Sequence, residues 1–102
     1  MKIDKKFVAD LVDSINGSYE FYMNDDASMI EKNGKYTIQY EDLNGMIYKI
    51  EFCCDMCTVS YVNFDGEYKL YAYMQNLSQW NKTTFIIDLV VTLMRLEKFL
   101  EG

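Results

Sequence analysis

The chain has 102 residues, a length that suits one domain and leaves little room for a second core. Half of the residues are hydrophobic and a quarter are charged, a composition that excludes a disordered chain. The net charge is −6 and is concentrated in the middle: residues 20–67 hold ten acids and three lysines, whereas residues 1–19 balance and residues 68–102 carry an excess of +1. Direct binding to nucleic acid or to an anionic membrane is therefore disfavoured, because both depend on cations in the protein.

The sequence predicts neither a membrane-spanning nor a secreted segment. The longest uncharged apolar run, residues 89–94, is far shorter than the ~20 residues that span a bilayer. The first residues lead into an amphipathic pattern, not into the apolar stretch of a signal peptide. We therefore expect a cytoplasmic protein, in which the three cysteines do not form a structural disulfide.

Asparagine or aspartate precedes four of the five glycines, and these pairs divide the chain. They are Asn16-Gly17, Asn33-Gly34, Asn44-Gly45 and Asp65-Gly66. Such pairs favour positive φ and mark helix ends and tight hairpin turns. Before the first pair, apolar residues at helical spacing predict an N-terminal helix; they are Ile3, Phe7, Val8, Leu11, Val12 and Ile15.

Apolar and polar residues alternate with a period of two in the segments that follow. These segments are residues 19–23, 36–41, 48–52, 58–64 and 67–74, with 28–32 as a sixth candidate. The short turns between them predict an antiparallel β-meander of about five to six strands. The triplet Asn24-Asp25-Asp26 is interpreted as a solvated turn, because it lacks the ligand spacing of a calcium loop.

A long C-terminal helix is predicted from about Thr83 to Glu101, after a polar connection at residues 75–82. One face of it is apolar and should pack on the sheet; it consists of Phe85, Ile86, Leu89, Leu93, Leu96 and Leu100. A second apolar face consists of Ile87, Val90, Val91 and Met94. One sheet cannot cover both faces, so either the first helix or a second copy of the chain covers the second one, and a homodimer through this candidate dimer face stays open.

The predicted fold class is therefore α+β: an N-terminal helix, an antiparallel meander and a long C-terminal helix packed on the sheet, in a single domain over residues 1–102.

The usual catalytic groups are missing from the sequence. The chain has no histidine, which removes the usual general base and the commonest metal ligand. Cys54 and Cys57 form a C-x-x-C motif with Cys53 beside it, but structural zinc takes four ligands. Small residues at a strand end, some of them buried, are the favoured interpretation, and a metal site completed by a second copy is the alternative. We expect no catalytic residue, no metal and no cofactor.

An acidic surface with tyrosines is the remaining candidate site. Its expected partner-binding residues are Glu20, Asp25, Asp26, Glu41, Asp42, Glu51, Asp55, Asp65, Glu67, Tyr71 and Tyr73. Tyr71 and Tyr73 are expected on the face of Glu67 and Lys69. Aromatic side chains supply contact area and charge steers the approach of a partner. The alternative is that the acids keep the protein soluble and the tyrosines are half-buried sheet residues.

These features favour a small, acidic, non-catalytic binding protein. The first hypothesis is an inhibitor of a basic, nucleic-acid-binding protein, such as a phage-type anti-restriction or anti-CRISPR nucleic-acid mimic, because carboxylates on a sheet can stand in for phosphates. An immunity protein or antitoxin that neutralises a basic toxin, or a dimeric adaptor or secretion-type chaperone, are the alternatives. An enzyme using carboxylates or thiols is disfavoured. The expected partner is a protein with a basic surface, without direct contact to nucleic acid or membrane.

Overall fold

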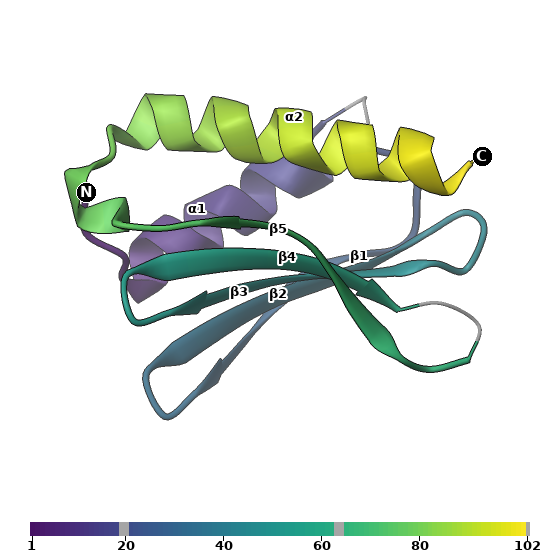
Figure 1. Ribbon diagram of the computed structural model, residues 1–102, viewed down its shortest axis with the longest axis horizontal. Helices are drawn as coiled ribbons and strands as arrows, with labels where there is room; N and C mark the ends of the chain where they lie inside the picture. The colour runs from purple at the N-terminus through teal and green to yellow at the C-terminus, as the bar shows by residue number, and fades with distance from the viewer. Residues whose placement is uncertain (19–20, 63–64, 102) are drawn as a thin grey trace.

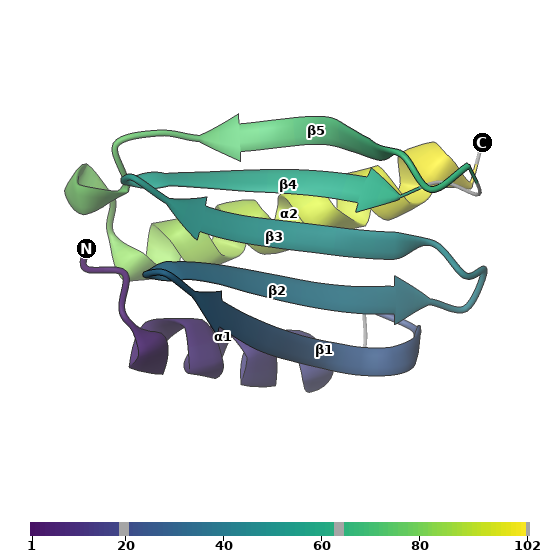
Figure 2. The same ribbon diagram turned by 90° about the horizontal axis from the view of Figure 1, so that it is seen from below.

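The computed structural model describes residues 1–18, 21–62 and 65–101. Two helices, α1 and α2, lie side by side on one face of a five-stranded antiparallel sheet (Figure 1, Figure 2). The strands follow one another in chain order across the sheet, from β1 at one edge to β5 at the other. The predicted α+β fold, with its meander and its two terminal helices, is confirmed.

Helix α1 spans Lys5–Asn16 and is held at both ends by side chains. Asp4 is its N-cap, with the Phe7 N–H donating to Asp4 Oδ1 over 2.9 Å. At the other end the Asn16 side chain binds both backbone groups of Ala27, accepting from its N–H (2.7 Å) and donating to its carbonyl (3.1 Å). These bonds tie the end of α1 to strand β1, and the apolar face of α1 packs into the core through Phe7, Val8, Leu11 and Ile15.

Strand β1 spans Met23–Lys32 and replaces two predicted features. The turn expected at Asn24-Asp25-Asp26 was wrong, because these residues belong to β1. Of the separate strand expected over residues 19–23, residues 19–20 lie outside the described residues, residues 21–22 are not in a strand, and Met23 is the first residue of β1. The polar triplet stays in the strand because the register shifts there: Asp25 lies opposite Glu41 and Ser28 opposite Gln39. Such a bulge leaves residues without a ladder partner, and the Asn16 side chain supplies the bonds for buried Ala27.

Strands β2 (Lys35–Asp42), β3 (Ile47–Cys53), β4 (Met56–Val62) and β5 (Tyr68–Met74) complete the sheet. Two of their connections are two-residue turns with positive φ at both positions: Asn33-Gly34 between β1 and β2, and Cys54-Asp55 between β3 and β4. Positive φ at both central residues is the twist that tight hairpins favour. The sheet face under the helices is apolar and buried, with Ile38, Tyr40, Tyr48, Ile50, Phe52, Cys57 and Val59 in the core.

Helix α2 spans Lys82–Leu100, after the short 3₁₀ helix η1 (Leu77–Gln79). The Asn81 side chain caps it by accepting from the N–H groups of Thr83 and Thr84. The predicted sheet-facing side is buried through Phe85, Leu89, Leu93 and Leu96. Among the described helices none has the length and hydropathy needed to cross a membrane.

The candidate dimer face of α2 is divided in the structure. Val90 is half-buried against the core, so this part of the face is already packed within the chain. Ile87 and Met94 keep 59% and 38% of their surface exposed, and Val91 is half-buried. Val90 therefore packs within the chain, and the homodimer stays a prediction for the exposed side of the face, Ile87 and Met94.

Candidate functional site

Acidic side chains collect at one end of the sheet, where the β2–β3 and β4–β5 connections meet the end of α2 (Figure 2). The register fixes this arrangement: Glu41 lies opposite Asp25 and Ile47, Ile47 opposite Val62, and Val62 opposite Tyr68. We call this region the acidic end and define it by eight residues: Asp25, Asp26, Glu41, Asp42, Asp65, Glu67, Glu97 and Glu101. A meander places alternate turns at the same end of a sheet, which gathers acids that are far apart in the sequence.

Six of the acids predicted from the sequence lie at the acidic end: Asp25, Asp26, Glu41, Asp42, Asp65 and Glu67. Glu20 lies outside the described residues. Glu97 and Glu101 were missed, because they belong to the C-terminal helix and the sequence pattern gives no sign of where that helix ends relative to the sheet. The length of α2, which runs the length of the sheet (Figure 1), brings them there.

Two predicted acids lie elsewhere and have partners within the chain. Glu51 is on the helix-free face of the sheet, where its carboxylate is 2.8 Å from Lys49 Nζ. Asp55 is in the β3–β4 turn at the opposite end, where it accepts from the Ser78 N–H (2.7 Å) and the Ser78 hydroxyl (2.9 Å). Its carboxylate fixes η1 to the turn.

Tyr71 and Tyr73 do not share a face, contrary to the sequence prediction. Ser60 lies opposite Leu70 and Val59 opposite Ala72, so Tyr71 is an extra residue in β5. This bulge turns Tyr71 toward α2, where its ring centre is 6.0 Å from that of Phe99. Tyr73 lies opposite Thr58 and is 57% exposed. Alternation along a strand holds only while the ladder is regular.

Exposed apolar side chains accompany the carboxylates at the acidic end. Tyr22 immediately precedes β1, Leu43 is in the β2–β3 connection and Tyr68 opens β5; their side chains are 71%, 60% and 54% exposed. The sequence carried a signal for one of them, since Leu43 stands in the polar turn segment Asp42–Gly45, where it has no sheet face to join. The acidic end thus combines carboxylates with apolar contact area.

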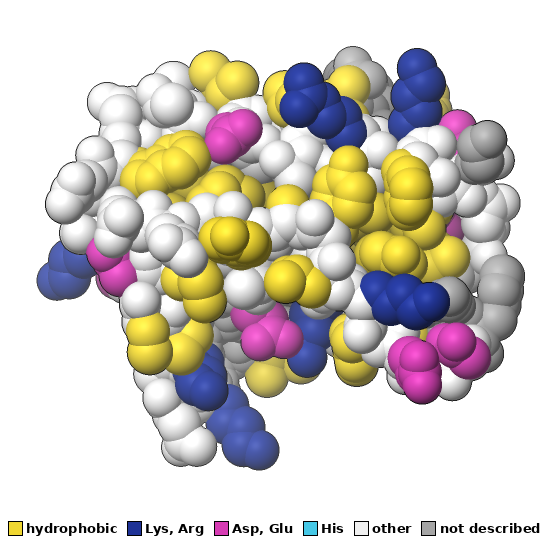
Figure 3. Space-filling model, in the orientation of Figure 1, with side chains coloured by type: hydrophobic (Ala, Val, Ile, Leu, Met, Phe, Trp, Pro, Cys, Tyr) yellow, Lys and Arg dark blue, Asp and Glu magenta, His cyan; other side chains and the backbone are white. Residues whose placement is uncertain are grey.

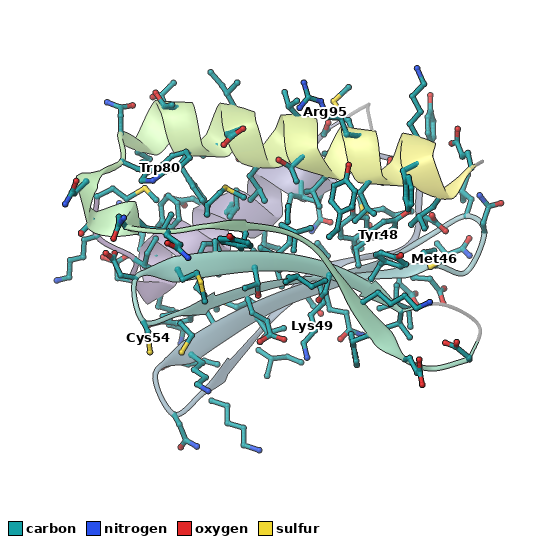
Figure 4. All side chains as sticks on the ribbon, viewed as in Figure 1. Met46, Tyr48, Lys49, Cys54, Trp80 and Arg95 are labelled. Carbon is teal, nitrogen blue, oxygen red and sulfur yellow. The ribbon has the colours of Figure 1, made fainter. Side chains whose placement is uncertain are left out.

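A network of tyrosines and carboxylates stiffens the acidic end. The Tyr48 hydroxyl donates to Asp42 Oδ2 over 2.7 Å, and Asp42 Oδ1 accepts from the N–H groups of Asn44 and Met46. The Tyr40 hydroxyl donates to Glu97 Oε1 over 3.2 Å, and the rings of Tyr40 and Tyr48 stack with centres 4.8 Å apart. Burial raises the pKa of both tyrosines, so their hydroxyls remain donors. Met46 and Tyr48 are labelled in Figure 4.

Within this network, Glu97 is a carboxylic acid with a raised pKa. Burial raises its pKa to about 7, and repulsion from Asp42 and Glu101 acts in the same direction, whereas the hydrogen bond from Tyr40 lowers it. The folded chain therefore holds a proton on Glu97 more tightly than the unfolded chain does. The stability that this proton contributes is present at acidic pH and is lost as the pH rises from about 4.5 to about 7.

Replacing Glu97 with Gln should remove this pH dependence and stabilise the chain at pH 8. Glutamine keeps an acceptor for Tyr40 but carries no charge at any pH. Because Glu97 is half-buried, we expect a gain of no more than about 2 kcal/mol after allowing for solvent screening. Urea unfolding at pH 5.5 and pH 8 measures the effect, with Glu31→Gln at the far end of the sheet as the control. An unchanged difference between the two pH values in Glu97→Gln would contradict this assignment.

The opposite end of the molecule carries most of the lysines. Lys32 and Lys35 flank the β1–β2 turn, and Lys2, Lys5, Lys6 and Lys82 lie around the start of the two helices. Figure 3 shows part of this polarity: acids gather over the β4–β5 connection at lower right, and lysines over the β1–β2 turn at lower left. Lys49, Lys69 and Lys98 stand beside the acidic end but leave it with an excess of negative charge.

The carboxylates of the acidic end are spread over the surface. The hollow beside Asp25, Asp26 and Glu41 is shallow, with Ser28, Gln39, Tyr40 and Ile47 as its other borders. In the parts of the chain that the structure describes, no three His, Cys, Asp or Glu side chains converge as a metal site would require. A distributed array of charges suits the recognition of an extended charged surface better than the chemistry of one small substrate.

Comparison of the chain with models of protein families, with curated proteins and with solved structures gave no match. The functional interpretation therefore depends on the geometry and the charge of the acidic end.

Proposed function

We propose that the chain is a non-catalytic binding protein whose acidic end docks on a basic surface of a partner protein. The observation that carries the proposal is the collection of eight acidic residues at one end of the sheet, with most lysines at the other. A dipole of this kind orients the chain before contact, because the partner's positive potential attracts one end and repels the other. The expected result is fast, salt-sensitive association.

The partner that we propose is a nucleic-acid-binding protein, which the chain inhibits in the manner of a phage-type anti-restriction or anti-CRISPR mimic. Strands about 4.8 Å apart hold Asp25 and Glu41 side by side. Hydrogen bonds from Tyr48 and two backbone N–H groups hold Asp42. A rigid set of negative charges loses little conformational freedom on binding, which favours competition with phosphates for the same cations.

The apolar side chains at the acidic end favour a protein as the partner. Tyr22, Leu43 and Tyr68 are exposed among the acids, and tyrosine is enriched among the residues that carry most of the binding energy in protein interfaces. Charge would steer the encounter, and these side chains would supply contact area once water is excluded. We place the encounter in the cytoplasm, where the free cysteines would stay reduced.

A dimeric adaptor is the second candidate function, and the exposed Ile87 and Met94 on the outer side of α2 favour it. The mass of the chain in solution separates the two candidates, since the inhibitor needs no second copy. A stable dimer that a Met94→Lys substitution dissociates would favour the adaptor.

Affinity capture tests the proposed inhibitor. The tagged chain is incubated with host lysate treated with nuclease, and bound proteins are eluted at rising salt. We expect a basic nucleic-acid-binding protein that is retained at low salt and released at high salt, because salt screens the charges of an exposed interface. A partner that resists high salt and is held through apolar contacts would contradict the proposal.

A further inference from the structure

Two adjacent thiols meet at the β3–β4 turn, far from the acidic end. Cys53 is the last residue of β3 and Cys54 is the first residue of the turn, and their Sγ atoms are 3.2 Å apart. Cys54 is exposed at the tip of the turn (Figure 4), whereas Cys53 is half-buried. Cys54 has a φ of 54°, a left-handed conformation in which it lies next to the Cys53 side chain. Both sulfurs are thus available to one incoming atom.

The spacing of the two sulfurs fits chelation of one atom better than a disulfide. Adjacent Cα atoms are about 3.8 Å apart across a trans peptide, which is shorter than the 4.4–6.8 Å that ordinary disulfides span, so closing one here would be strained. An atom that bonds both sulfurs at about 2.3 Å with an angle near 90° separates them by about 3.3 Å. The same bonds at a tetrahedral centre separate them by about 3.8 Å, and at a linear centre by about 4.6 Å.

The neighbouring groups do not add a third protein ligand. Cys57 is fully buried, and burial raises the pKa of its thiol to about 12, which keeps it protonated. The Asp55 carboxylate is engaged by the Ser78 N–H and hydroxyl. The site therefore suits an atom that bonds two protein sulfurs and whose third ligand does not come from the protein.

We propose that Cys53 and Cys54 form a chelating dithiol site for pyramidal, thiophilic centres, with trivalent arsenic compounds as the ligand class. A hollow of about 150 Å³ beside the thiols gives room for an organic group on the arsenic. Its apolar borders are Ile3, Tyr36, Phe52 and Met56. An aryl arsenical should therefore bind at least as well as arsenite itself.

The chemistry needs no oxidant or reductant. Hydrated phenylarsine oxide carries two hydroxyl groups on arsenic, and each thiol displaces one of them. Two As–O bonds break and two As–S bonds form, and each thiol proton leaves with a hydroxyl group as water. Arsenic stays trivalent throughout. Joining two thiols on one centre raises the affinity about 10²–10⁴-fold over a single thiol, because the second bond forms within one molecule.

Intact-mass measurement with phenylarsine oxide tests the site. The reduced chain is treated with the arsenical, exposed to excess glutathione and desalted. We expect one phenylarsenic group per chain, retained against glutathione and removed by the dithiol 2,3-dimercaptopropanol. Cys54→Ser and Cys53→Ser should each lose retention by about 10²–10⁴-fold, while Cys57→Ala keeps it.

Circular dichroism checks that each variant folds, and exposed Cys54 gives a variant that leaves the core intact. Failure of the folded wild-type chain to retain the arsenical, or equal retention by Cys54→Ser, would overturn the proposal.

Discussion

Replacing Leu93 with Ala should lower the free energy of unfolding by about 2–5 kcal/mol, which is the usual cost of emptying a fully buried leucine site. Leu93 is completely buried in the core with Leu89 and Leu96 on the same side of α2. The substitution removes apolar surface from the core and leaves a cavity that a rigid sheet cannot close. Urea unfolding followed by circular dichroism measures the loss.

Met94→Ala is the matched control for Leu93→Ala. Met94 is the next residue, but it lies on the outer side of α2 and is 38% exposed, so its truncation should cost much less. Equal losses in the two variants would mean that α2 does not face the sheet through Leu93. That result would also remove the basis for placing Glu97 at the acidic end, because the orientation of α2 fixes both residues.

Reversing two charges at the acidic end should weaken binding to the captured partner about 10- to 1,000-fold, the range over which electrostatic steering changes association. The double substitution Asp25→Lys and Glu41→Lys changes two residues that lie opposite each other in β1 and β2. Because both change sign, the repulsion between like charges across the strands is preserved and the fold should tolerate the change. Titration calorimetry or surface binding at fixed salt measures the dissociation constant.

A second double variant separates local charge from total charge. Glu31→Lys with Asp88→Lys reverses two exposed acids outside the acidic end. Each exchange adds +2, so both double variants go from −6 to −2. If binding depends on the acidic end, the control should bind nearly as well as the wild-type chain. Equal weakening in both variants would show that only the total charge matters.

The fold could be predicted from local patterns in the sequence, because a few residues mark each helix, strand and turn. Asn-Gly pairs located turns, a period of two located strands, and apolar spacing in α2 identified the buried side that includes Phe85 and Leu93. The pattern failed where the ladder is irregular. The bulge after Asp25 keeps a polar triplet inside β1, and the bulge at Tyr71 turns that side chain toward α2.

The candidate site was less predictable, because it depends on which ends of the elements meet. The acids of the turns could be listed from the sequence, but Glu97 reaches the site through the length of α2 and a bond from Tyr40. The partner of Asp55 is Ser78, which comes from η1, whereas the partner of Glu51 is Lys49, two residues earlier in the same strand. The spacing of Lys49 and Glu51 puts both side chains on one face of a strand, but nothing in the sequence indicates that Asp55 is engaged by Ser78.

Competition with nucleic acid tests the central proposal most directly. The captured partner is bound to a fluorescent oligonucleotide, and the chain is added while the anisotropy of the label is recorded. We expect the wild-type chain and the Glu31→Lys, Asp88→Lys control to release the oligonucleotide, while the Asp25→Lys, Glu41→Lys variant needs about 10- to 1,000-fold more protein for the same release. An anisotropy that stays constant or rises, because the chain and the oligonucleotide bind the partner together, would contradict the proposal.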